Sequence, residues 1–314
     1  MNVRAAFHIA LGCVAVGLAA CGGGGSSTPA PPISSASPTP IPSPPYVFAA
    51  TSPVTYFPVV FTSVTTASYS AIGTLVNAPV DATSDTNNNV YFTDGTSVFV
   101  YKVAANGVVS QTRSFSGTAT FTAIAADASG DVFATTKSAS VQEYGPSATG
   151  SSTPIATVAG ATTTLQNPIA VAVDSTGKIY VGDTVTTCPS PPSAAILIFS
   201  SGASGNVAPA TTVCLGFAAW QATQFAIDAH NVLYYAASSI NVYDPNNVNG
   251  KGVQYFFGGG LNTGVAVDAS GNIYGSASFP ATGQTIFIYT PQGTQLSAYQ
   301  AFFLSASNPI AVNR

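Results

Sequence analysis

One short pattern recurs along this chain: an aspartate, then glycine or asparagine three residues later, then a short apolar stretch that ends in an aromatic residue. The five copies begin at Asp85, Asp127, Asp174, Asp228 and Asp268. Successive aspartates are separated by 42, 47, 54 and 40 residues. A repeat of about 40 to 50 residues is typical of a four-stranded β-propeller blade. The spacing therefore predicts an all-β repeat fold.

The repeated aspartates have a structural explanation. In a tight turn, an Asp side chain accepts hydrogen bonds from backbone N–H groups two residues on, and Gly or Asn takes the left-handed conformation that closes the turn. We therefore assign a turn-building role to the members of the pattern. They are Asp85, Asp127, Gly130, Asp174, Gly177, Asp228, Asp268 and Gly271.

Each unit also has room for four strands. The residues before the aspartate, such as 169–173, are small and β-branched, which suits the crowded zone near a propeller axis. A second strand follows the turn, and a third ends in an aromatic residue that can pack between neighbouring blades. Third strands are predicted at 98–101, 141–144, 196–199, 240–243 and 286–289. The fourth strand is the least regular, and we expect little helix.

The two ends of the chain supply one more unit. Residues 308–312 repeat the Asn-Pro-Ile-Ala-Val of residues 167–171, so the chain stops after an inner strand. Residues 46–50 resemble a second strand, and 54–63 and 68–75 are available as the third and fourth. Sharing one blade between the termini closes a ring and leaves no long free edge. The sequence therefore predicts a six-bladed β-propeller of four-stranded blades, with the last blade shared.

Residues 1–20 have the features of an export signal. Arg4 precedes an apolar run of 16 residues, which is shorter than the roughly 20 residues that a membrane-spanning helix needs. The Leu-Ala-Ala-Cys at 18–21 resembles the bacterial lipobox, in which the cysteine is lipidated and the chain is cut before it. Cys21 is therefore the predicted lipidation site, and an ordinary secretory signal is the alternative.

The next residues form a tether. Residues 21–45 would comprise the lipidated Cys21 and a Gly/Ser/Pro segment able to span up to about 70 Å, which leaves 46–314 for the propeller. Position 22 is Gly rather than Asp, so by resemblance the inner-membrane retention signal is absent. We therefore expect a lipid anchor in the cell envelope of a bacterium, at the outer membrane, on its periplasmic or surface side.

Charge and cysteine content limit the partners. Only 6% of the chain is charged, and without the signal six basic residues face eleven acidic ones, a net charge of −5. Such a surface has no basic stripe for phosphates, which argues against nucleic acid. Cys188 and Cys214 are an even pair in an oxidising compartment, which favours a disulfide, with two buried free thiols as the alternative.

The units at 167–215 and 261–290 resemble NHL repeats, in particular those of bacterial lipoproteins. The similarity extends over about residues 46–314 and is weakest in the first unit and in the one shared by the termini. It implies a six-bladed propeller used mostly for binding, with related propellers acting as metal-dependent lactonases and lyases.

The residues that such enzymes need are scarce here. The chain has one glutamate, Glu143, which falls on a third strand, remote from the axis, and one histidine after the signal, His230, which falls in a turn. Asp94 and Asp183 end second strands, where a structural role is favoured over metal ligation. A Ser/His/Asp triad would have to use that one turn histidine. We therefore expect no catalytic residue, no metal and no cofactor.

The favoured function is a non-catalytic binding or protein-interaction module with a protein, small-molecule or glycan ligand. A lactonase- or lyase-like enzyme and a structural envelope component remain the alternatives. The face opposite the Asp turns is expected to bind, because length variation concentrates there at 184–195 and 276–285. Its candidate anchors are Phe217, Trp220 and Phe279, and the alternative for Phe217 and Trp220 is that they fill the gap between blades.

Overall fold

The computed structural model describes most of the second of two compact units, 1–40 and 41–314. Its described residues are 46–49, 55–58, 70–71, 79–189, 193–215, 224–237, 239–247, 261–279, 283–301 and 309–313. Cys21, Phe217 and Trp220 lie outside them, as do the predicted signal and tether. Among the described residues the structure consists of strands and one 3-10 turn, η1 (Ala161–Thr163), which confirms the all-β prediction.

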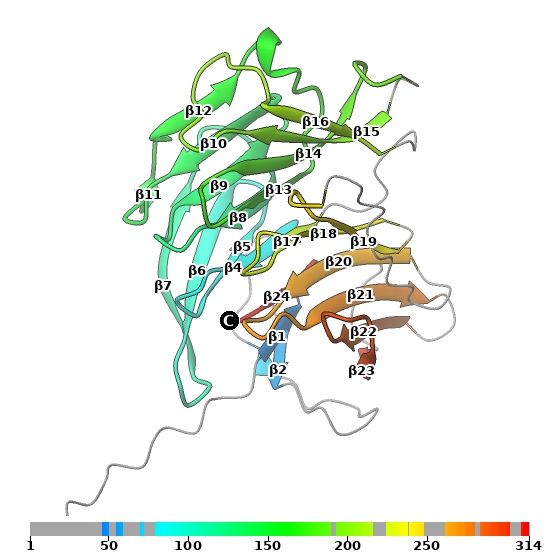
Figure 1. Ribbon diagram of the computed structural model, residues 1–314. Helices are drawn as coiled ribbons and strands as arrows, with labels where there is room; N and C mark the ends of the chain where they lie inside the picture. Colours follow the sequence, from blue (N-terminus) through cyan, green and yellow to red (C-terminus); the bar gives the residue numbers. More distant parts are fainter. Residues whose placement is uncertain are drawn as a thin grey trace, which may run out of the picture. The chain divides into compact units, whose positions relative to one another are not determined.

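The described strands form six sheets, which follow one another along the sequence colours of Figure 1. One contains β4 (Asp81–Ser84), β5 (Asn89–Thr93), β6 (Ser97–Val103), β7 (Val109–Ser116) and the short β11 (Gly150–Ser151). The next contains β8 (Phe121–Ala126), β9 (Val132–Thr136), β10 (Ser140–Tyr144) and β12 (Ala156–Ala159). The third contains β13 (Ala170–Val173), β14 (Ile179–Val185), β15 (Ser193–Phe199) and β16 (Thr211–Cys214).

The remaining three sheets come from the second half of the chain and its two ends. The fourth contains β17 (Phe225–Ile227), β18 (Leu233–Ala236) and β19 (Ile240–Tyr243). The fifth contains β20 (Leu261–Val267), β21 (Ile273–Phe279), β22 (Gly283–Tyr289) and β23 (Gln295–Ala301). The last contains β24 (Ile310–Val312), β1 (Tyr46–Ala49), β2 (Thr55–Pro58) and β3 (Ser70–Ala71). The predicted third strands are β6, β10, β15, β19 and β22.

The sheets are arranged as a β-propeller. Neighbouring strands within a blade are antiparallel, and the first strand of each blade contacts the first strand of the next in the order β4, β8, β13, β17, β20 and β24. The cycle closes because β24 also contacts β4. These strands line the axis, and the blades radiate from it, each with four strands of its own except the β17–β19 blade, of which three strands are described.

The last sheet joins the two ends of the propeller, as the repeated Asn-Pro-Ile-Ala-Val predicts. Val47 lies opposite Val312 and Ala49 opposite Ile310 in the antiparallel pair β1–β24. The Asn313 N–H donates to the Tyr46 carbonyl at 3.2 Å. A strand from the C-terminus therefore completes a sheet whose other strands come from the N-terminal side.

The core lies between blades. Six clusters of buried apolar side chains occur in the described part, and each draws its residues from two successive sheets around the ring. Side chains alternate along a strand, so Tyr91 faces the following blade while Phe92, the next residue, faces the preceding one. The third-strand residue Tyr144 packs against Phe115 with ring centroids 5.0 Å apart. The expected packing of third-strand aromatics between blades is confirmed.

Outer edges are protected by loops from the following blade. Between its third and fourth strands, one blade contributes β11, which pairs in parallel with Phe115 and Ser116 of β7. The same loop of the next blade bridges Gly205 to Val158 of β12. An unpaired outer strand would be open to association with other chains, so these bridges cover a vulnerable edge.

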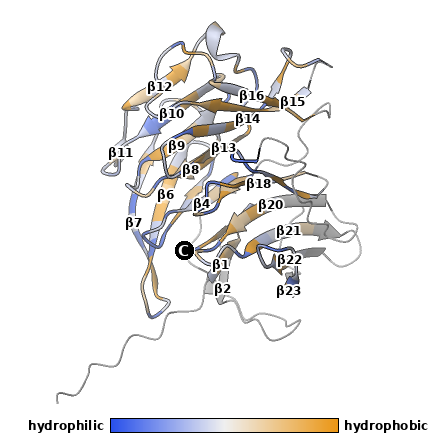
Figure 2. Ribbon diagram, viewed as in Figure 1, coloured by the Kyte–Doolittle hydropathy of each residue, from blue (hydrophilic) through white to orange (hydrophobic). Residues whose placement is uncertain are grey.

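Figure 2 shows hydrophobic colours along β6, β13 and β18 and hydrophilic colours along the outer strand β7.

Candidate functional site

The Asp turns have the geometry that the sequence predicts. In the copy at Asp174, Oδ1 accepts the N–H groups of Thr176 at 2.8 Å and Lys178 at 3.0 Å. The other four aspartates accept the corresponding pair of N–H groups. The fourth turn position has positive φ in every copy: Asn88, Gly130, Gly177, Asn231 and Gly271. The carboxylates thus stabilise the turns between first and second strands.

The aromatic residue of the pattern contributes a contact that sequence reasoning missed. Six residues after the aspartate, a buried tyrosine donates its hydroxyl to the second carboxylate oxygen. The O···O distances are 2.8 Å for Tyr91, 3.1 Å for Tyr180, 3.3 Å for Tyr234 and 2.8 Å for Tyr274. Burial and the nearby carboxylate raise the pKa of Tyr180, so the hydroxyl keeps its proton. The copy at Asp127 differs, because Phe133 occupies this position.

The turns surround a hollow at one end of the propeller axis. Its volume is about 310 Å³, and its lining includes all five repeated aspartates together with alanine, valine and isoleucine side chains. We call it the turn-face hollow. It differs from the rest of the axis, where a cavity of about 40 Å³ leaves room for a few water molecules only.

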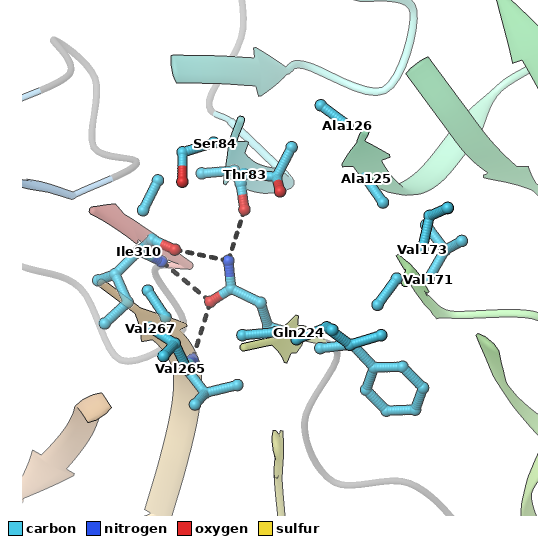
Figure 3. Close-up of a pocket in the computed structure, with 17 residues that line it drawn as sticks. Thr83, Ser84, Ala125, Ala126, Val171, Val173, Gln224, Val265, Val267 and Ile310 are labelled. Carbon is cyan, nitrogen blue, oxygen red and sulfur yellow. Dashed lines mark hydrogen bonds between the residues drawn. The ribbon is translucent and has the colours of Figure 1, made fainter. Parts of the chain in front are cut away.

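Gln224 fills the propeller axis between the inner strands of the blades (Figure 3). Its Nε2 donates to the carbonyls of Ala82 at 2.6 Å and Ile310 at 2.7 Å. Its Oε1 accepts the N–H groups of Val265 at 3.0 Å and Ile310 at 3.1 Å. One side chain, only 3% exposed, thereby satisfies inner-edge backbone groups of β4, β20 and β24. Gln224, which immediately precedes β17, therefore connects its own blade with the shared blade of β24 and with the blades of β4 and β20 on either side of the shared one.

Two neighbours complete this layer. A Cβ on Gly264 would lie 2.7 Å from Gln224 Oε1, so glycine is required at this close approach. Asp81, which is 3% exposed, accepts the Ile124 N–H through Oδ2 at 2.8 Å. Burial raises the pKa of Asp81 to about 8, partly offset by the N–H groups of Ile124 and Ala82. Asp81 and Gln224 each stand four residues before a repeated aspartate. At this position a polar residue is unusual, because the inner strands consist mainly of small, apolar residues, and sequence reasoning missed this signal.

The opposite face is braced by long-range contacts. Asp183 at the loop-side end of β14 is fully buried and accepts the N–H groups of Gln166 at 2.8 Å and Asn167 at 2.7 Å, which precede β13. Gln166 Nε2 then donates to Thr186 Oγ1 at 2.9 Å. Burial raises the pKa of Asp183. This aspartate has a structural role, as predicted.

The disulfide lies in the same region. Cys188 and Cys214 are bonded, with Cα atoms 5.8 Å apart, and join the loop after β14 to the fourth strand β16 of the same blade. Thr186, Thr187 and Pro189 beside it are exposed. The predicted pairing is confirmed. We call residues 184–189 the braced loop.

The other predicted positions on this face give a mixed outcome. Phe279 is the last residue of β21 and lies opposite Gly283, whereas Phe217 and Trp220 fall outside the described residues. The segment 276–285, expected to be a loop insertion, is mainly an extended hairpin, since β21 runs to Phe279 and β22 begins at Gly283. Its small residues let the strands continue pairing beyond the sheet core.

The residues weighed for catalysis are dispersed. Glu143 lies on β10, and the side chain of His230 is 87% exposed and 3.9 Å from Asp228. Asp94 accepts the Thr96 and Ser97 N–H groups in a turn. Within the described ranges, no three His, Cys, Asp or Glu side chains are close enough to hold a metal ion. In the same ranges, no helix has the length and apolarity to cross a membrane.

Comparisons with known proteins reveal similarity at the level of structure. No family model and no curated protein matches this chain. A functionally unknown protein from Desulfotomaculum acetoxidans DSM 771 aligns with a TM-score of 0.55 and 12% identity over 87% of this chain and 99% of that chain. A streptogramin B lyase structure gives 0.47 and 14% over 71% and 68%. The WD40 β-propeller domain of Doa1 gives 0.42 and 13% over 71% and 69%. At these identities the similarity concerns the fold alone.

Proposed function

We propose that this chain is a lipid-anchored β-propeller of the cell envelope, with six NHL-like blades, that acts as a non-catalytic binding or protein-interaction module. The six sheets are taken as the six blades, the three-stranded β17–β19 sheet included. The ligand would bind the face opposite the Asp turns. The anchor would be the lipid on Cys21, at the outer membrane.

The braced loop is the observation that carries this proposal. Its exposed residues Thr186, Thr187 and Pro189 are fixed at one side by Asp183 and Gln166 and at the other by the disulfide. Binding a partner costs about 0.5–1.5 kcal/mol for each mobile side chain that must be ordered. A loop that is already ordered avoids much of this cost, so rigid, exposed loops favour recognition.

Photo-crosslinking from two positions tests the binding face. A photoreactive amino acid is placed at Thr187 in the braced loop or at Ser129, an exposed residue of an Asp turn, in the full chain expressed in its own envelope. We expect one recurrent crosslinked species from Thr187 and none of it from Ser129. The same species from both positions, or from Ser129 alone, would contradict the proposed face. Crosslinks only between copies of this chain would favour a structural envelope component.

The anchor is tested separately. Replacing Cys21 by Ser should abolish incorporation of labelled palmitate and release the chain from the membrane fraction. A chain that remains attached without the label would contradict the lipid anchor and leave the binding face unaffected.

A further inference from the structure

The turn-face hollow has apolar side chains in its lining and an exposed rim. Ala126, Val173 and Ile227, each the last residue before a repeated aspartate, belong to this lining. Ala128, Ala229 and Ala269, each the first residue after one, are exposed and line the same hollow. A volume of about 310 Å³ is at the lower end of the range found for small-molecule sites.

The charged side chains that line this hollow are all carboxylates, whereas Lys102 and Arg113 lie outside the lining and donate to the carbonyls of Asn87 and Gly130. Five aspartates from five successive blades line it, and their hydrogen-bond partners are backbone N–H groups, tyrosine hydroxyls and neutral side chains. The ring Nδ1 of the exposed His230 lies 3.9 Å from Asp228 Oδ2. Hydrogen bonds from neutral donors leave the negative charge of a carboxylate in place. A cation entering the hollow would therefore be attracted from several sides at once.

From this combination we infer that the turn-face hollow binds a small organic ammonium ion that carries an apolar body. The apolar body contacts the alanine, valine and isoleucine side chains, and the positive charge lies among the carboxylates. A neutral compound of the same shape gains only the apolar contact, and an anion is repelled. This site is separate from the face proposed above for the partner, so each can fail without the other.

Benzyltrimethylammonium is a suitable probe, with benzyl alcohol as the neutral comparison and phenylacetate as the anion. Each is titrated into the full chain at low salt, and backbone amide resonances are followed by NMR. We expect saturable shifts at Ala128, Ala229 and Ala269 with the cation, binding at least about 10-fold weaker with the alcohol, and none with the anion. Added salt should weaken the binding of the cation alone.

Two adjacent residues of one turn give a matched pair of variants. Ala128→Phe fills the hollow from its rim and should weaken binding of the cation at least about 10-fold. Ser129→Phe adds the same bulk at an exposed position that does not line the hollow and should leave binding unchanged. Ala269→Phe, from another blade, repeats the test if Ala128→Phe is unstable.

Asp127 separates charge from shape. Its Oδ1 accepts two N–H groups and its turn is followed by Phe133 rather than tyrosine, so Asp127→Asn retains the acceptor that holds the turn. This variant should weaken cation binding about 3-fold and leave benzyl alcohol binding unchanged. Equal affinities for the cation and the anion, shifts outside the hollow, or equal effects of Ala128→Phe and Ser129→Phe would overturn the inference.

Discussion

The two faces of this propeller are stabilised by different kinds of contact. On the Asp-turn face, the same local hydrogen bonds recur from blade to blade, between residues two to six positions apart. On the opposite face and at that end of the axis, the described contacts of Asp183 and Gln224 each occur once and span longer distances along the sequence, up to the 142 residues between Gln224 and Ala82. When a contact is repeated in several blades, the loss of one copy removes only a part of the stabilisation, whereas the loss of a unique contact removes all of it. Substitutions should therefore cost more on the second face than on the first.

The largest effect is expected at Gln224. Gln224→Leu leaves the N–H groups of Val265 and Ile310 and the carbonyls of Ala82 and Ile310 without their partner in the axis. Each buried polar group left unpaired costs about 1–3 kcal/mol, so we expect the free energy of unfolding to fall by at least about 4 kcal/mol. Urea unfolding provides the measurement. Gln111→Leu, at an exposed glutamine of the outer strand β7, is the control and should cost less than about 1 kcal/mol.

Loss of the disulfide should rank next. The bond closes a loop with a sequence separation of 26 residues, which corresponds to about 3 kcal/mol of loop-closure entropy. The double variant Cys188→Ala, Cys214→Ala should lose about this much on thermal or urea unfolding while the Asp turns stay intact. A loss under about 1 kcal/mol would mean that Asp183 and Gln166 alone hold the braced loop.

Asp81 makes a pH-dependent contribution at the same end of the axis. Because burial raises its folded pKa to about 8, the folded state binds a proton more tightly than the unfolded chain does. Stability from this group is therefore greatest below about pH 4 and is lost as the pH rises toward 8, by at most about 1.4 kcal/mol per pH unit. Urea unfolding at several pH values should give this slope in the wild type and a flatter one in Asp81→Asn. Equal slopes would show that Asp81 does not titrate in this way.

The smallest effect is expected on the repeated face. Tyr180→Phe removes one hydroxyl that donates to Asp174 and should cost about 1.5 kcal/mol. Phe133→Tyr is the reverse change in the one copy that lacks the hydroxyl, and it should gain about 1 kcal/mol through a new bond to Asp127. Differential scanning calorimetry of the two variants compares them directly. A cost for Tyr180→Phe as large as that for Gln224→Leu would remove the distinction between the faces.

The sequence predicts what is repeated and local. The Asp turns with left-handed Gly130, Gly177 and Gly271, the third strands, and the strand shared between the termini all follow from short motifs. The disulfide follows from an even number of cysteines in a chain that begins with a predicted export signal. The described strands at the N-terminal end, β2 and β3, lie within the predicted segments 54–63 and 68–75.

The hydrogen bonds at the propeller axis could not be predicted from short sequence motifs. Gln224 bonds residues 142 and 86 positions away, and no local pattern specifies which backbone groups face one another across a ring. The turn-face hollow is formed from five turns that are far apart in sequence, so its volume depends on how the blades pack. In a repeat protein, the sequence therefore indicates a unique contact only where one residue differs from its counterparts in the other repeats. Gln224 is such a residue, because it occurs among small apolar residues.

Native-state hydrogen exchange of the full chain tests the central distinction most directly. The amides of Val265 and Ile310 lie on the inner edge of their strands and donate to Gln224. If this unique contact closes the ring, both amides should exchange only with global unfolding, as slowly as the best-protected strand amides and far more slowly than the exposed turn amide of Ser129. In Gln224→Ala they should exchange by local opening while strand amides in β14 stay protected. Rapid exchange of Val265 and Ile310 in the wild type, or unchanged protection in Gln224→Ala, would contradict this account.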